Sequence, residues 1–62
     1  MSPLFAALTA GKLPGALLDT GKVSVSTLRR WERKGWIRRA GANNPRAWGY
    51  IALTRDGYSA VQ

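Results

Sequence analysis

Apolar residues recur at helical spacing through the first half of the chain and predict helices there. The first helix is expected between Pro3, which suits a first helical turn, and Gly11, which can end a helix. A shorter stretch with the same spacing predicts a second helix over residues 13–19, closed by Gly21. The residues expected on the inner faces of these two helices are Leu4, Phe5, Leu8, Ala16 and Leu17, with Leu18 as a further candidate.

A third helix is predicted over residues 24–34. Ser24 is a good N-cap, and Gly35 can adopt the left-handed conformation that ends a helix. At about 100° per residue, one arc of this helix is apolar apart from a single acid and consists of Val25, Leu28, Trp31, Glu32 and Gly35. The opposite arc is polar and basic and consists of Ser26, Arg29, Arg30, Arg33 and Lys34. One face is therefore expected to pack and the other to be cationic.

From Trp36 the apolar period changes to two, which is typical of strands. Residues 36–40 and 47–53 are predicted to form a β-hairpin around a loop at residues 41–45, and Thr54 is predicted to cap a short terminal helix. The expected fold of the single domain, residues 1–62, is mostly α with a small β-hairpin. Three helices, a two-stranded wing and a short C-terminal helix follow one another in the order of a winged helix-turn-helix.

Charge is concentrated in the middle of the chain. Ten Lys and Arg against three Asp and Glu give a net charge of +7, and the seven cations and one acid of residues 22–39 account for +6 of it. Positive charge concentrated in one short segment favours a polyanionic partner. With no His, no Cys and three separated carboxylates, the chain is not expected to be an enzyme or to hold a metal or cofactor.

Location is judged from the N-terminal residues and from the cysteine content. The first residues lack the basic start and long apolar run of a signal peptide, and without Cys nothing points to an oxidising compartment. A cytoplasmic protein with no membrane partner is expected.

Residues 23–37, VSVSTLRRWERKGWI, resemble the pattern V-S-x-x-T-L-R-Y-Y-E-x-x-G-L-I of the mercury-resistance-regulator (MerR) family of winged-helix proteins. Gly49 and Tyr50 resemble the G-Y of that family's wing. The resemblance implies that Arg29 binds a DNA phosphate, that Arg30 replaces an aromatic residue near the DNA backbone, and that Trp31 is a core residue. Members of that family continue into a long dimerisation helix and an effector domain, whereas this sequence stops at Gln62, so no small-molecule effector is expected.

Other DNA-binding families share parts of this pattern. The same minimal winged helix is similar to phage excisionases and to the DNA-binding ends of terminase small subunits. Residues 53–57, LTRDG, resemble the L-T-x-x-G that closes the wing of multiple-antibiotic-resistance (MarR) repressors. These resemblances agree on DNA binding and leave the biological role open between a small transcriptional regulator and a phage or mobile-element accessory factor.

The sequence thus predicts sequence-specific binding of double-stranded DNA, with helix 24–34 in the major groove and the 36–53 hairpin as the wing. The cations are expected mostly at phosphates, and Ser26, Thr27 and Arg30 are expected at base edges. The full set of expected DNA-binding residues is Lys22, Ser26, Thr27, Arg29, Arg30, Arg33, Lys34, Arg38, Arg39, Asn43, Asn44 and Arg46. Because a DNA-binding domain this small contacts only a short stretch of duplex, it is expected to act with a second copy of itself or with another DNA-bound protein. The alternatives are an RNA-binding winged helix and a module that binds an acidic protein.

Overall fold

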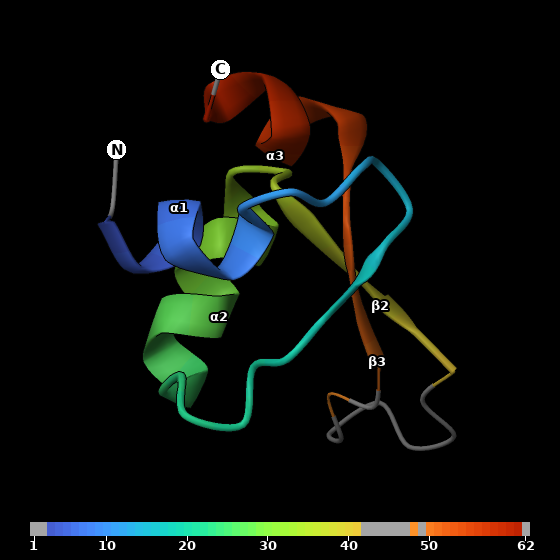
Figure 1. Ribbon diagram of the computed structural model, residues 1–62. Helices are drawn as coiled ribbons and strands as arrows, with labels where there is room; N and C mark the ends of the chain where they lie inside the picture. Colours follow the sequence, from blue (N-terminus) through green and yellow to red (C-terminus); the bar gives the residue numbers. More distant parts are fainter. Residues whose placement is uncertain (1–2, 42–47, 49, 62) are drawn as a thin grey trace.

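The computed structural model describes residues 3–41, 48 and 50–61. Its elements, in chain order, are α1 (Pro3–Thr9), β1 (Leu17–Leu18), α2 (Val25–Arg33), β2 (Ile37–Ala40), β3 (Tyr50–Leu53) and α3 (Arg55–Ala60) (Figure 1). The strands form one antiparallel sheet in the order β1-β3-β2. The domain is therefore mixed α/β, and the expectation of a mostly α fold with a two-stranded sheet is wrong.

The predicted helix over residues 13–19 does not form, because this segment joins the sheet. Gly15 has a φ of +90°, and its backbone N–H donates to the Leu53 carbonyl at 2.7 Å. The Leu53 N–H donates in turn to the Ala16 carbonyl at 2.9 Å, and Leu17 and Leu18 pair with Ala52 and Ile51. Partners distant in sequence thus supply the backbone hydrogen bonds that a local helix would have made.

The strand also changes the connection between α1 and α2. Residues 10–24 separate the two helices, so they are not joined by the short turn of a helix-turn-helix pair. In β1 successive side chains point to opposite faces of the sheet, so Leu18 is buried and Leu17 is 55% exposed. The expectation that Leu17 faces inward is therefore wrong.

Helix α2 begins and ends where the sequence predicts. The Ser24 side chain accepts a hydrogen bond from the Thr27 backbone N–H, which satisfies an amide that the first turn leaves unpaired. At the other end Gly35 has a φ of +79° and donates to the Glu32 carbonyl, while the Trp36 N–H donates to the Trp31 carbonyl. This pair of bonds is a Schellman motif, and it turns the chain directly into β2.

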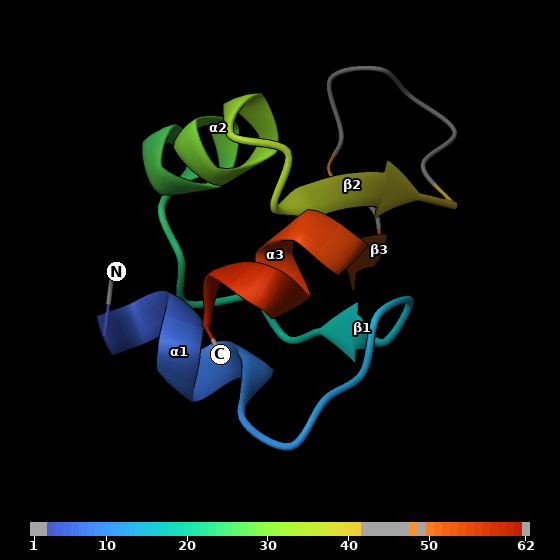
Figure 2. The same cartoon turned by 90° about the horizontal axis from the view of Figure 1, so that it is seen from above.

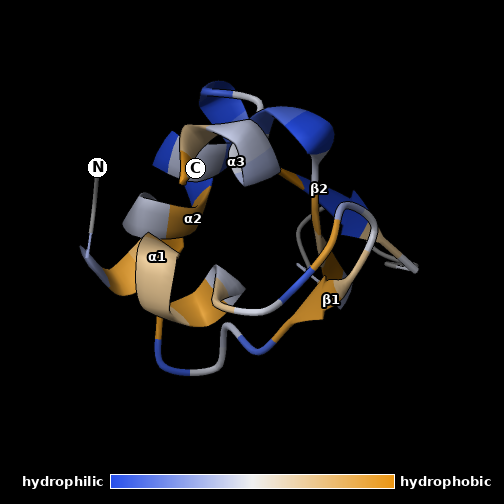
Figure 3. Ribbon diagram, turned by 45° about the horizontal axis from the view of Figure 1, so that its top comes forward, coloured by the Kyte–Doolittle hydropathy of each residue, from blue (hydrophilic) through white to orange (hydrophobic). Residues whose placement is uncertain are grey.

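The core lies between α1, α2 and the inner face of the sheet. Its buried residues are Phe5, Leu18, Leu28, Trp31, Ile37, Ile51 and Leu53. The Phe5 ring lies 4.8 Å from that of Trp31, edge-on, and 4.9 Å from that of Trp36, so α1 braces the inner side of α2. Leu4 and Val25 were expected to pack but are about half exposed, because each lies at the margin of its helix's buried face. Figure 3 shows the apolar residues along α1 and β1, and polar residues on β2 and the first turn of α3.

Helix α3 closes one end of the domain. The prediction that Thr54 caps it is confirmed, since the Thr54 hydroxyl oxygen accepts a hydrogen bond from the Gly57 N–H at 2.9 Å. Gly57 is buried against the Trp36 carbonyl, and a Cβ at this position would collide with that carbonyl and approach a Leu53 methyl to 2.9 Å. Within the described part of the chain, no helix is long and apolar enough to span a membrane.

Candidate nucleic-acid interface

The outer side of α2 is exposed and basic. Leu28 and Trp31 anchor the helix, and at about 100° per residue the positions directly opposite them are Ser26 and Arg33, with Arg29 and Arg30 on either side. All four side chains are exposed. In Figure 2 α2 lies at one side of the molecule, with α1, α3 and β1 all on its inner side. We call Ser26, Arg29, Arg30, Arg33 and Lys34 the basic face of α2.

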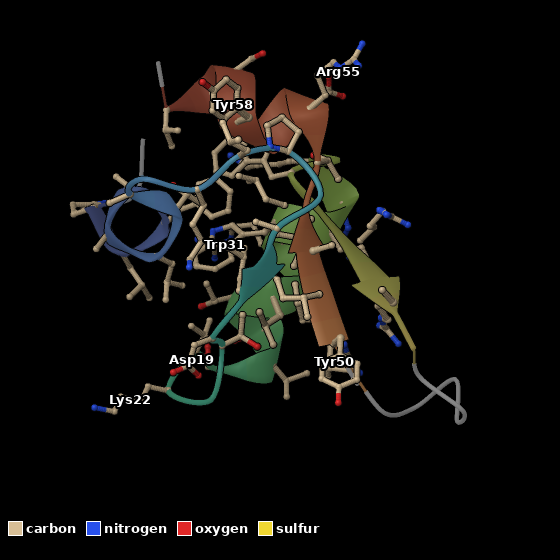
Figure 4. The ribbon with its side chains drawn as sticks, turned by 45° about the vertical axis from the view of Figure 1, so that its right-hand side comes forward. Asp19, Lys22, Trp31, Tyr50, Arg55 and Tyr58 are labelled. Atoms are coloured by element: carbon tan, nitrogen blue, oxygen red, sulfur yellow. The ribbon has the colours of Figure 1, made fainter. Side chains whose placement is uncertain are left out.

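Two lysines extend this surface at its ends. Lys34, the C-cap residue, is exposed, and its Nζ lies 4.7 Å from the centroid of the Trp36 ring. Lys22 is exposed in the loop that leads into the first turn of α2, close to Asp19 (Figure 4). Asp19 accepts a hydrogen bond from the Gly21 N–H at 3.3 Å. The cations of the basic face thus lie from the second turn of α2 to its C-cap, and Lys22 lies just before the N-cap.

Repulsion within the basic face weakens the helix that carries it. Arg29 and Arg33 are four residues apart, as are Arg30 and Lys34, so both like-charged pairs are neighbours on the helix surface. Each such pair destabilises a helix by about 0.2–0.5 kcal/mol. Cations in the last turn are also favoured by the helix dipole, which offsets part of this repulsion in the free protein, and a bound polyanion would relieve it further.

Thr27 is not part of the outward surface. Its side chain is half-buried, and its hydroxyl lies 2.8 Å from the Ser24 hydroxyl within the N-cap. Of the three residues predicted to reach base edges, only Ser26 and Arg30 therefore lie on the basic face of α2. Thr27 is held in the cap that starts the helix.

Arg38 and Arg39 are adjacent in sequence but lie on opposite faces of the sheet. Arg38 pairs with Ala52 on the outer face, as Leu17 does, and its side chain is exposed away from α2. Arg39 pairs with Ile51 on the inner face and points toward α2. The structure thus separates Arg38 from the basic face of α2, although both are on the surface.

Arg39 is engaged by residues of two other segments. Its Nε lies 3.0 Å from Glu32 Oε2 and its Nη2 lies 3.4 Å from Glu32 Oε1, so the guanidinium and the carboxylate meet through two bonds. The same guanidinium lies over Trp48, with its central carbon 3.7 Å from the ring centroid. Neither Glu32 nor Trp48 is among the residues that the sequence predicts at the site. The signal available for Glu32 was its position as the single acid within residues 22–39.

The predicted contacts of the hairpin tip, Asn43, Asn44 and Arg46, lie outside the described residues. A groove of about 590 Å³ runs along the flank of α2 beside Arg30 and Lys34, and Trp31 and Trp36 are among its lining residues. Because Trp31 is only 2% exposed, its ring is not a platform on which a nucleic-acid base could stack. Among the described residues, no group of three or more His, Cys, Asp or Glu is arranged to hold a metal ion.

Comparisons of the chain with protein-family models, with curated proteins and with solved structures give no match.

Proposed function

We propose that the protein binds double-stranded DNA by placing the basic face of α2 in the major groove. The observation that carries the proposal is that the outward side of α2 holds four exposed cations and no exposed acid. The one acid of that helix, Glu32, is paired with Arg39. An exposed face with charges of a single sign is the usual footprint of a nucleic-acid-binding surface.

An α-helix with its side chains is about 10–12 Å across, and the major groove of B-DNA, about 12 Å wide, accepts it. Helix α2, with nine residues, extends about 14 Å along its axis. Ser26 lies near the N-terminus of α2, the part of a recognition helix that goes deepest into the groove, and Arg30 follows one turn later. Arg29 and Arg33 would then contact phosphates, as most cations at such interfaces do.

The hairpin of β2 and β3 is proposed as the wing of a winged-helix arrangement. Sheet order β1-β3-β2 leaves β2 at the edge, and β2 contacts α2, so a duplex bound to α2 would also lie near this strand. The resemblance of residues 23–37 to the MerR pattern supports this proposal. It also favours a role as a small transcriptional regulator or as an accessory factor of a phage or mobile element.

The test is the salt dependence of duplex binding for two double variants of equal charge. Arg29→Gln/Arg33→Gln and Lys12→Gln/Arg55→Gln both lower the net charge from +7 to +5, and Figure 4 shows Arg55 at the end of the molecule opposite Lys22. Each phosphate contact adds about 0.9 to the slope of log affinity against log salt. The first double variant should therefore bind weakly on every sequence, with a slope flatter by about two.

The Lys12→Gln/Arg55→Gln control should keep nearly the wild-type slope. Equal losses of affinity and slope in the two double variants would mean that α2 is not the interface. Tighter binding to an RNA duplex than to the DNA duplex would mean that the partner of the basic face is RNA.

A further inference from the structure

The contact between Glu32 and Arg39 joins α2 to the hairpin. Glu32 lies on the flank of α2 that faces β2, and Arg39 projects from the inner face of β2, beyond the core residue Ile37. The two hydrogen bonds, at 3.0 and 3.4 Å, join the guanidinium to both oxygens of the carboxylate.

Trp48 fixes the same guanidinium from a third segment. Its ring is half-buried, lies just before β3 in sequence, and has the Arg39 guanidinium 3.7 Å from its centroid. A planar guanidinium can stack on an aromatic ring and bind a carboxylate at its edge simultaneously, which an ammonium group cannot do. The cluster of Glu32, Arg39 and Trp48 thus ties together α2 and both sides of the hairpin.

Stability alone is a weak reason for this cluster. The side chains of Arg39 and Glu32 are 28% and 37% exposed, and ion pairs with this exposure contribute little to the free energy of unfolding. Glu32 also removes one unit of positive charge from the surface proposed to bind DNA. What the cluster does provide is a defined orientation of the hairpin base relative to α2.

We propose that Glu32 is a positioning residue that determines DNA specificity without touching DNA. By holding Arg39 against Trp48, it presents α2 and the hairpin to the duplex in one relative orientation, so that both reach their contacts together. A nonspecific site requires only charge and gains nothing from that orientation. The inference rests on the DNA-binding function proposed above.

The experiment compares three variants on a preferred duplex, obtained by random-site selection with the wild-type protein, and on a scrambled duplex. Glu32→Gln and its matched control Asp56→Asn, on α3, both raise the net charge from +7 to +8. Arg39→Lys keeps the charge and removes the planar group. The quantity measured is the ratio of the two affinities, together with the melting temperature of each variant to establish that it is folded.

Glu32→Gln should bind the scrambled duplex more tightly than wild type, yet its affinity ratio should fall by about fivefold or more, which corresponds to one well-made base contact. Arg39→Lys, which keeps the charge, should lower the ratio similarly. Asp56→Asn should raise both affinities equally and keep the ratio. An unchanged ratio in Glu32→Gln, or an equal fall in Asp56→Asn, overturns the inference.

A measurement without DNA distinguishes failure of this inference from failure of the proposed function. In ¹⁵N NMR spectra of the free protein, the Arg39 Nε–H should exchange slowly with water in wild type and rapidly in Glu32→Gln. Rapid exchange in wild type would mean that the cluster is not formed, and this inference alone would fail. If the Nε–H is protected but the wild-type protein binds no duplex, the proposed function fails and the specificity role falls with it.

Discussion

Truncation of Trp31 should remove most of the stability of the domain. The ring is 2% exposed, lies edge-on to Phe5 at 4.8 Å, and sits at the centre of the molecule between the helices and the sheet (Figure 4). Replacing a buried Trp by Ala costs about 3–5 kcal/mol. At about 0.05–0.15 kcal/mol per residue, a chain of 62 residues has a total stability of about 3–9 kcal/mol. Trp31→Ala should therefore unfold much of the protein at room temperature or melt far below wild type.

The assay is thermal and urea unfolding followed by circular dichroism. Each kcal/mol lowers the melting temperature of a domain of this size by about 4–8 °C, so a decrease of at least about 12 °C is expected. Leu4→Ala is the control, because Leu4 is 45% exposed and its truncation should lower stability by less than about 1 kcal/mol. A Trp31→Ala protein that melts within about 2 °C of wild type would show that the core is not organised around α2 as described.

Four further substitutions test individual elements by the same unfolding assay. Gly57→Ala should destabilise the protein by about 1–3 kcal/mol, because the new Cβ meets the Trp36 carbonyl, and this outweighs the better helix propensity of Ala. A gain in stability would contradict the close packing of α3 against Trp36. Leu18→Ser should destabilise far more than Leu17→Ser, since only Leu18 is buried, and the reverse order would contradict the strand assignment of β1. Ser24→Ala should lower stability by about 1 kcal/mol through loss of the N-cap, and no change would mean that the cap is not formed in solution.

The elements that the sequence predicts correctly are those with local signals. Ser24 and Gly35 bound α2 through bonds made within a few residues, and Thr54 caps α3 in the same way. The period-two pattern after Trp36 likewise predicts β2 and β3. In each of these segments the side chains that direct the backbone are neighbours in sequence, so the prediction needs no knowledge of the rest of the fold.

The element that the sequence mispredicts depends on distant partners. Residues 13–19 have apolar spacing that fits a helix, but their backbone bonds to Leu53 and their pairing with Ile51 and Ala52 come from the other end of the chain. A two-residue strand offers too few positions for a period to be recognised.

The candidate site shows the same division between local and nonlocal information. The basic face of α2 follows from helical geometry, and the structure shows it exposed. The separation of Arg38 from Arg39 depends on the register of β2 against β3, and the capture of Arg39 by Glu32 and Trp48 depends on how α2 packs on the sheet. A list of basic residues contains none of this information.

The most direct test of the central claim is a map of amide chemical-shift changes as the protein is titrated with a DNA duplex. If α2 enters the major groove, the largest changes should fall on residues 22–34, with smaller ones on β2, and α3 should change little. Changes concentrated on α1 and α3, with residues 22–34 unmoved at saturation, would contradict the account.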